Sequence, residues 1–273
     1  MTTVNTNLQA LHAQNALAVN ERQLNKSMQE LSTGLRVNSA ADDAASLAIG
    51  TKMGARVASL QQALRNSNDG ISMLQTADGA ASTISTMLYR MNELAIQASN
   101  NTYASTDLSA LNSEFSDLKA QISNIVTNTT WNGRTLLNGS LGSLSIQVGI
   151  NGASTDTVSA SFSTNFSNLA VLSANGVSNS TDTAAALTAV ASSISTVDTA
   201  RSGWGASINR LNYAADSNAN VAMNLSVSKS QLVDADYAKA TADLAKAQIL
   251  QAAGTAMLSQ ANQQPIMVLR LLS

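Results

Sequence analysis

Cysteine is absent from this sequence of 273 residues, and proline, aromatic and charged residues are scarce. Without cysteine the chain can form neither disulfide bonds nor thiolate metal sites. Only 12% of the residues are charged, against ~25% in a typical soluble domain. Only 3% are aromatic, and Pro265 is the one proline. A compact enzyme with a wide core and proline-bearing loops is therefore not expected.

The charge distribution argues against two kinds of partner. The net charge of −2 supplies no basic surface to neutralise phosphates, so nucleic acid is not expected as the principal partner. No apolar run approaches the ~18 residues of a membrane-spanning helix, so membrane insertion is not expected. Residues 1–20 contain no Asp, Glu, Lys or Arg and lack the basic region of a secretory signal peptide. If the protein leaves the cell, we expect another export route.

Residues suited to catalysis or metal binding are equally few. His12 is the only histidine, and no arrangement of carboxylates that would complete a metal site is visible. The sequence contains no nucleophile–base set, phosphate-binding loop or dinucleotide fingerprint. We therefore predict no catalytic, metal or cofactor-binding residues, no cofactor and no enzyme activity.

Small and uncharged polar residues dominate the chain. Ala, Ser, Thr and Asn supply 133 of the 273 residues. Among them, apolar residues recur at alternating spacings of three and four, which is typical of helices packed in coiled-coil fashion. The clearest series runs from Leu187 to Leu232, with 11 of its 14 positions apolar, and shorter series cover 53–95 and 108–125. They predict a mainly α fold, an elongated coiled-coil-like helical bundle that forms a rod.

Two short motifs have structural rather than catalytic interpretations. Asp42 and Asp43 stand before the helix expected over 43–99, where negative charge and a capping side chain favour helix initiation. Gly50 and Gly54 have the spacing that allows close helix contact, and the charged residues around them favour a soluble bundle over a membrane.

The helical periodicity gives way to alternation between residues 144 and 162. Apolar residues alternate with polar or small ones from Leu144 to Ile150, and Asn151-Gly152 supplies a turn signal before a second alternating run. This pattern predicts a small β-hairpin at about 144–162. The following segment, 163–181, is rich in Ser, Asn and Thr, and we expect it to form an exposed loop.

Both ends of the chain carry apolar residues at helical spacing but almost no charge. Residues 1–20 have none, and residues 247–273 have only Arg270. A solvated helix normally displays charges, so we expect these ends to pack against other chains and to be marginally helical or disordered alone. The N-terminal stripe consists of Leu17, Leu24, Met28, Leu31 and Leu35, and the C-terminal stripe of Leu244, Ala247, Leu250, Met257 and Ala261.

Long stretches at both ends resemble the bacterial flagellins. Near the N-terminus, residues 31–49 read LSTGLRVNSAADDAASLAI, and Asp69-Gly70-Ile71-Ser72 resembles the next block of that family. Near the C-terminus, residues 234–244 read DADYAKATADL, followed by QANQQP at 260–265. The order and separation of these blocks also fit, and the chain resembles a short flagellin that lacks large outer variable domains.

The resemblance implies two domains. Residues 1–40 and 234–273 would pair as a terminal helical core domain that is disordered in the monomer, and both stripes would become buried in filament assembly. Residues 41–233 would form a helical rod domain that carries the hairpin and the exposed loop.

The function implied by the resemblance is that of a structural subunit that self-assembles into the bacterial flagellar filament for motility, by coupled folding and assembly of its terminal helices. The implied location is extracellular, after type III export without a cleavable signal peptide. The implied partners are further copies of the chain, the flagellar export apparatus, a chaperone of the C-terminal helix, and the filament cap and hook-junction proteins.

Residues 88–97 resemble the flagellin patch that the innate immune receptor Toll-like receptor 5 recognises. Arg90 and Leu94 match that patch, with Glu93 beside them and Glu114 as the partner acid on the next helix. The alternative role for these residues is rod-to-rod packing in a filament, which we expect to be the primary one.

Two alternative functions share these features. A hook–filament junction protein has similar terminal helices, and a flagellin-like surface adhesin would reuse the fold to bind glycans. Glycan sites often offer an exposed aromatic platform with polar neighbours. Trp131, near a predicted turn, is the candidate for such a contact, whereas Trp204 falls on the helical series and is expected in the core.

Overall fold

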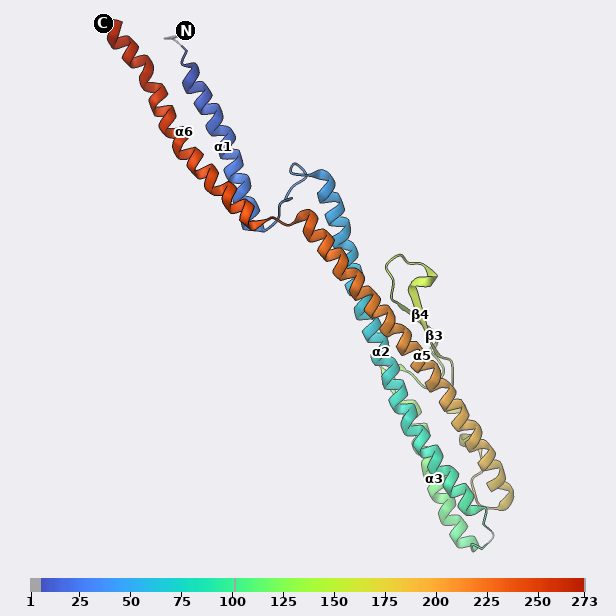
Figure 1. The fold of residues 1–273 in the computed structure, drawn as a ribbon. Coiled ribbons are helices and arrows are strands. Elements are labelled where there is room, and N and C mark those ends of the chain that lie inside the picture. The colour runs from blue at the N-terminus through green and yellow to red at the C-terminus, as the bar shows by residue number, and fades with distance from the viewer. Residues whose placement is uncertain (1–5, 101, 273) are drawn as a thin grey trace. The chain divides into compact units, whose positions relative to one another are not determined.

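A computed structural model of the chain describes residues 6–100 and 102–272, which are mainly α-helical (Figure 1). The mainly α fold predicted from the sequence is thus confirmed. Residues 1–5 and 273 of the expected terminal domain lie outside the described residues. The helices are α1 (Leu8–Thr33), α2 (Ala44–Ala98), α3 (Ser105–Asn128), α4 (Ala170–Ser173), α5 (Ser180–Val233) and α6 (Tyr237–Leu272).

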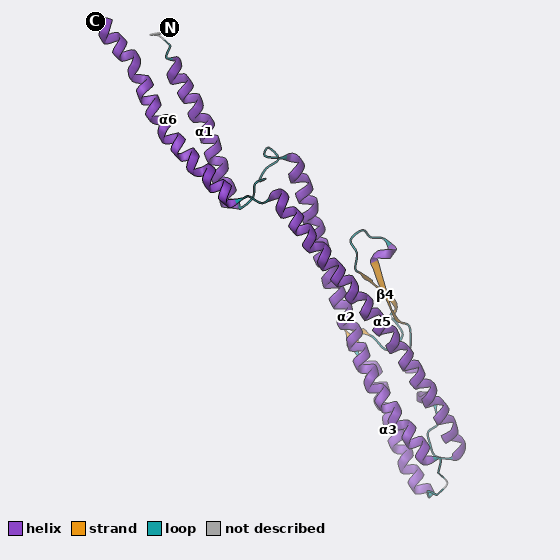
Figure 2. Ribbon diagram, viewed as in Figure 1, coloured by secondary structure: helices purple, strands orange, loops and turns teal. Residues whose placement is uncertain are grey.

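Short strands lie between α3 and α4 (Figure 2). β1 (Thr130–Trp131) pairs with β2 (Arg134–Thr135), and β3 (Gly142–Gln147) pairs with β4 (Thr157–Phe162). The second pair is antiparallel, from Gly142 opposite Phe162 to Gln147 opposite Thr157, so the predicted hairpin is confirmed. Its alternation has the expected cause, because Ile146, Val158 and Ala160 face the core while serines face outward.

The described residues form two compact units, which we describe separately. One unit contains the residues up to Ala55 and those from Asn224 onward, and therefore holds α1 and α6 together with the start of α2 and the end of α5. The other unit extends from Arg56 to Met223 and holds the rest of α2 and α5, with α3, α4 and the strands.

In the Arg56–Met223 unit, apolar faces of α2, α3 and α5 meet in one core. Most of the core positions are those of the predicted three-and-four series, because that spacing keeps them on one side of each helix. Among the 14 positions of the series in α5, only Lys229 is exposed. Fully buried members of the core include Leu74, Ile84, Leu88 and Met91 of α2, Phe115 and Ile122 of α3, and Val190, Val197 and Leu211 of α5.

Two polar residues interrupt the apolar series of α5 within this unit, and each has a specific partner. Arg201 Nε donates to Asp78 Oδ1 of α2 at 2.8 Å, and this bond raises the pKa of Arg201. Asn218 Nδ2 donates to the carbonyl oxygen of Val148 at 2.7 Å. Half-buried polar groups are tolerated when they are hydrogen-bonded, so these partners explain why the series contains them.

The segment 163–181, expected to be an exposed loop, is exposed only in part, because its apolar side chains pack into the core. It contains a 3₁₀ turn, η2 (Phe166–Asn168), and the short helix α4. The apolar side chains of Phe166, Leu169, Val171 and Val177 are buried there. These few apolar residues at separated positions decide the placement of the segment, although Ser, Asn and Thr dominate its composition.

Trp204 of α5 is the centre of this packing. Its ring lies 5.8 Å from the ring centroid of Phe162 and 6.0 Å from that of Phe166, so it joins the hairpin and the 163–181 segment to α5. Its indole Nε1 donates to the carbonyl oxygen of Ser161 at 2.8 Å. A buried tryptophan needs such a partner for its N–H, and the hairpin supplies it.

Side chains of α3 and α5 hold the 163–181 segment through its backbone. Ser193 Oγ accepts from Val171 N at 3.1 Å, and Asn112 Oδ1 accepts from Val177 N at 2.9 Å. Lys119 Nζ donates to the carbonyl oxygen of Ala174 at 2.7 Å, in a position where burial lowers the pKa of the lysine. The segment is therefore ordered by long-range contacts.

The hairpin sits on α2 at a glycine. A Cβ atom on Gly70 would lie 2.6 Å from Ile146 Cδ1 and 3.3 Å from two other carbons of the same side chain. Asn66 Nδ2, one turn earlier on α2, donates to the carbonyl oxygen of Gln147 at 3.2 Å. Only glycine allows the isoleucine to approach the helix this closely.

Gly70→Val should therefore destabilise the Arg56–Met223 unit by about 1–3 kcal/mol, because the new side chain overlaps Ile146. Gly79→Val is the matched control, since Gly79 lies on the exposed side of α2 with nothing within 4 Å of an added Cβ. We expect the control to be neutral or slightly stabilising, because glycine is a poor helix former. Urea unfolding of the full chain, followed by circular dichroism, measures both, and equal midpoints would contradict the seating of Ile146 on Gly70.

Candidate assembly surface

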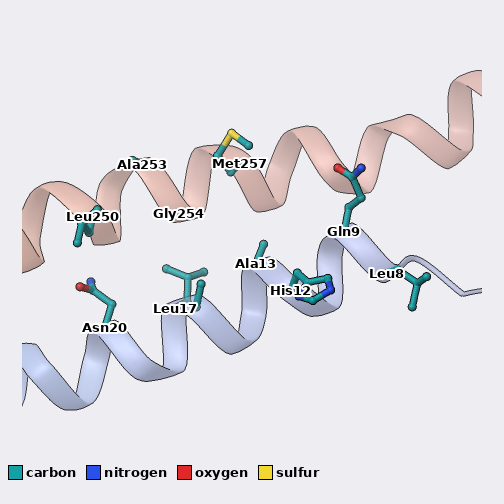
Figure 3. A pocket seen from close by; sticks show the side chains of 11 residues that line it. Leu8, Gln9, His12, Ala13, Leu17, Asn20, Leu250, Ala253, Gly254 and Met257 are labelled. Atoms are coloured by element: carbon teal, nitrogen blue, oxygen red, sulfur yellow. The ribbon is translucent and has the colours of Figure 1, made fainter.

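In the first unit, α1 and α6 pack side by side and antiparallel (Figure 1). The residues of α6 that face α1 most closely are small and recur every seven positions. Half-buried leucines recur at the same interval on α1, and Leu17 lies so close to Gly254 that a Cβ there would be 2.6 Å from its Cδ2 (Figure 3). Leucines of one helix therefore fit against small residues of the other. The small residues of α6 are Ala240, Ala247, Gly254 and Ala261.

Asn20 of α1 and Asn7, the residue that caps α1, each donate a hydrogen bond across the contact between α1 and α6, which we call the seam. Asn20 Nδ2 donates to the carbonyl oxygen of Ala247 at 2.7 Å, and Asn7 Nδ2 donates to that of Ala261 at 2.8 Å. Ser27, also at the seam, is fully buried, and its hydroxyl has no hydrogen-bond partner among the described residues. These residues could not be identified from the sequence, because a polar side chain at helical spacing does not indicate which carbonyl group it will contact.

The two predicted stripes are only partly buried in the structure. Most of their members are buried or half-buried: Leu17, Leu24, Leu31, Leu35, Leu244, Ala247 and Ala261. Three remain exposed, Met28 at 53%, Leu250 at 49% and Met257 at 65% of their surface. The pairing of α1 with α6 thus satisfies only part of the apolar surface of the stripes.

The exposed remainder borders an open groove along the two helices (Figure 3). One stretch, of about 690 Å³, has Leu8, His12 and Ala16 on its α1 side and Leu250 and Met257 on its α6 side. No Asp, Glu, Lys or Arg is among the described residues that line it.

An adjoining stretch continues the groove along the same helices. It has a volume of about 670 Å³ and shares His12, Ala16 and Leu250 with the first. Asp243 and Lys246 stand at its side. The described lining of the groove is therefore free of Asp, Glu, Lys and Arg at one end and has a charged edge at the other.

Further large apolar side chains are exposed on the same two helices. Leu8, Leu11 and Val19 of α1 and Ile249 of α6 each expose about half of their surface or more. Single exposed apolar residues are ordinary, but Leu8, Val19, Leu250 and Met257 all line the groove, and such a group is typical of a surface that another protein covers. The α1/α6 pair is the candidate assembly surface.

The connections to α1 and α6 are tied together by backbone hydrogen bonds. Ala235 N donates to the carbonyl oxygen of Gly34 at 2.9 Å, and Arg36 N donates to that of Val233 at 2.7 Å. Gly34 ends α1 at φ +71°, a conformation that favours glycine. A Cβ on Gly50 would lie 2.6 Å from Val233, so close packing explains at least the first glycine of the Gly50–Gly54 motif.

Asp42 and Asp43 organise the connection between α1 and α2. Asp43 Oδ1 accepts from Ser46 N at 3.0 Å and caps α2, as predicted. Asp42 Oδ2 accepts from Ser39 N at 2.9 Å and from Ser39 Oγ at 3.0 Å, with Lys26 Nζ 3.7 Å from its other oxygen. These hydrogen bonds lower the pKa of both carboxyl groups.

A lowered pKa means that ionised Asp42 stabilises the connection above the ordinary carboxyl pKa, and that this contribution is lost as the pH falls through the folded-state value. Ser39→Ala removes the hydroxyl donor and should raise the pKa of Asp42 toward the ordinary value. Ser46→Ala is the control, because Ser46 contacts Asp43 instead. Carboxyl NMR titration of Asp42 measures the effect, and an unchanged pKa in Ser39→Ala would contradict it.

Arg90, on the Arg56–Met223 unit, forms two ion pairs. Its Nε lies 2.8 Å from Glu114 Oε1 of α3, and its Nη1 lies 3.1 Å from Glu93 Oε2. These three side chains are exposed, whereas Leu94 is fully buried in the core and contributes nothing to the surface patch expected there. Leu94 follows Met91 by three positions, so it shares the buried face of α2.

Trp131 lies in β1 opposite Arg134, where it is half-buried against the core. It is therefore only partly available as an aromatic platform. Among the described residues, no three His, Asp or Glu side chains are grouped so as to hold a metal ion. None of the described helices has the length and apolar character needed to cross a membrane.

Comparison with known proteins identifies relatives over almost the whole chain. The bacterial flagellin N-terminal helical region matches residues 4–142, and the bacterial flagellin C-terminal helical region matches residues 187–272. The flagellin of Halalkalibacterium halodurans is 39% identical over 269 residues, covering 98% of this chain and 99% of that protein. The flagellin of Bacillus subtilis is 35% identical over 303 aligned residues, covering 98% and 99%.

A solved structure shares the fold. The crystal structure of Bacillus cereus flagellin superposes with a TM-score of 0.52 at 28% identity, covering 56% of this chain and 88% of that one. The fold and the relatives together define a structural protein of the bacterial flagellum. The chain belongs to the bacterial flagellins, which polymerise into the extracellular filament that serves motility. The resemblance seen in the sequence is thereby confirmed.

Proposed function

We propose that the groove between α1 and α6 is the surface through which neighbouring subunits pack in the filament. The observation that carries this proposal is the exposure of Leu250 and Met257 beside the groove. A helix of a second copy, with its own exposed apolar face, is the occupant that fits. Each subunit would use its groove toward one neighbour and a different face toward the next, and such contacts generate an open polymer rather than a closed ring.

Folding of α1 and α6 is proposed to be coupled to this assembly. The seam buries mainly alanine and glycine on the α6 side, so the two helices gain little apolar burial from each other alone. Packing against neighbours would supply the remainder, and the ends of the monomer would stay disordered until then. The end of α1 at Thr33 and the start of α6 at Tyr237 support the proposed domain boundaries at 1–40, 41–233 and 234–273, although the two compact units divide later, at Ala55, and earlier, at Asn224.

The further partners of this surface are proposed from the resemblance to flagellins. An unfolded end suits passage through the flagellar export apparatus. A chaperone would cover the apolar face of the C-terminal helix before export. The filament cap and the hook-junction proteins would contact the first and last subunits through the same terminal helices.

Leu250→Asp combined with Met257→Asp should abolish polymerisation, because two buried charges would face an apolar partner. We expect the critical concentration to rise by about a hundredfold or more. Gln248→Asp is the control, because it places one charge of the same sign on an exposed α6 residue outside the groove. Sedimentation of polymer over a concentration series measures all three, and wild-type assembly of the double variant would contradict the proposal.

Hook–filament junction and adhesin functions have no comparable support. The relatives are named as flagellins, and Trp131, the candidate glycan contact, is half-buried.

Recognition by Toll-like receptor 5 is proposed as a secondary role of the charged patch formed by Arg90, Glu93 and Glu114. Their exposure supports access from solution, and the bond to Glu114 fixes the guanidinium on the surface. Rod-to-rod packing in the filament remains the primary role that we propose for the patch.

Arg90→Ala should reduce receptor activation by the monomer by about tenfold, if this arginine is an interface anchor. Arg65→Ala, on the same helix and outside the patch, should leave activation unchanged. A cell-based receptor reporter titrated with each protein measures the effect, and identical curves for Arg90→Ala and wild type would contradict the receptor role.

A further inference from the structure

The side chain of Asn7 makes two hydrogen bonds with different purposes. Its Oδ1 accepts from Ala10 N at 3.1 Å and caps the start of α1. Its Nδ2 donates across the seam to the carbonyl oxygen of Ala261 at 2.8 Å. One amide group therefore both begins α1 and attaches it to α6.

The carbonyl group of Ala261 is unusual among those of α6. In an α-helix a carbonyl oxygen accepts from the N–H four residues later, which for Ala261 is position 265. That position is Pro265, which has no N–H, and α6 nevertheless continues to Leu272. Ala261 is buried, so without another donor its carbonyl group would be left unsatisfied, which is unfavourable. Asn7 supplies the donor that the proline lacks.

The second asparagine of the seam makes a different kind of contact. Asn20 Nδ2 donates to the carbonyl oxygen of Ala247, whose helical donor would be the N–H of Gln251. That bond adds to a helical one, whereas the bond from Asn7 replaces a missing one. Only one alignment of α1 on α6 brings Asn7 to the carbonyl that lacks its donor.

We propose that Asn7 and Pro265 form a register lock, in which the proline frees one carbonyl of α6 and Asn7 recognises it. The register lock rests on the assembly function proposed above and adds that the alignment of α1 on α6 is fixed by Asn7. The groove is lined by both helices, so a slip of α1 would move His12 and Ala16 relative to Leu250 and Met257 and deform the surface that the neighbour meets. Asn7 is thus a positioning residue for assembly.

A double-mutant cycle tests the lock in full-length protein. Asn7→Ser keeps a good helix cap but is too short to reach Ala261. We expect it to raise the critical concentration for polymerisation about five- to tenfold, the effect of one lost hydrogen bond to a buried group. Pro265→Ala restores a backbone N–H four residues after Ala261, so in that background Asn7→Ser should change the critical concentration less than about twofold.

Asn25→Ser, an exposed position of α1, is the matched control and should have no effect in either background. If Asn7→Ser raises the critical concentration equally in both backgrounds, or in neither, the lock is overturned, since a purely capping role does not depend on Pro265. If the wild type itself forms no polymer, the proposed function fails instead. The same cycle is then measured by thermal unfolding of the four proteins. The lock again requires that Asn7→Ser lowers the unfolding midpoint and that this decrease disappears in the Pro265→Ala background.

Discussion

Close contact between α1 and α6 is the constraint on which the assembly surface depends. The seam is narrow because alanine and glycine recur every seven positions on α6, and Leu17 reaches the helix at Gly254. Such a seam buries little apolar area per residue. It leaves Leu250 and Met257 exposed, and we propose that a second copy of the chain covers them.

The Arg56–Met223 unit, in contrast, buries its large apolar side chains within itself. Its large side chains face inward, and Trp204 joins α5 to the hairpin and to the 163–181 segment. This unit has a continuous core of its own, so it does not need a neighbour in order to fold. In the proposed assembly, the Arg56–Met223 unit folds in the monomer, and the unit that contains α1 and α6 is completed by neighbouring subunits.

Much of this organisation was accessible from the sequence, because helical spacing is a local property. The series in α5 correctly identified the buried face that includes Leu211 and Trp204, and alternation identified the hairpin. The burial of the 163–181 segment was not accessible, since it depends on a few apolar residues meeting Trp204 from far away in the chain. The hydrogen bond from Asn7 to Ala261 was not accessible either, because it joins residues at opposite ends of the sequence and nothing near Asn7 indicates Pro265.

Cryo-electron microscopy of filaments grown from the purified chain tests the central claim most directly. The account predicts that a helix of a neighbouring subunit occupies the groove between α1 and α6 and covers Leu250 and Met257. Filaments in which these two side chains face solvent would contradict it.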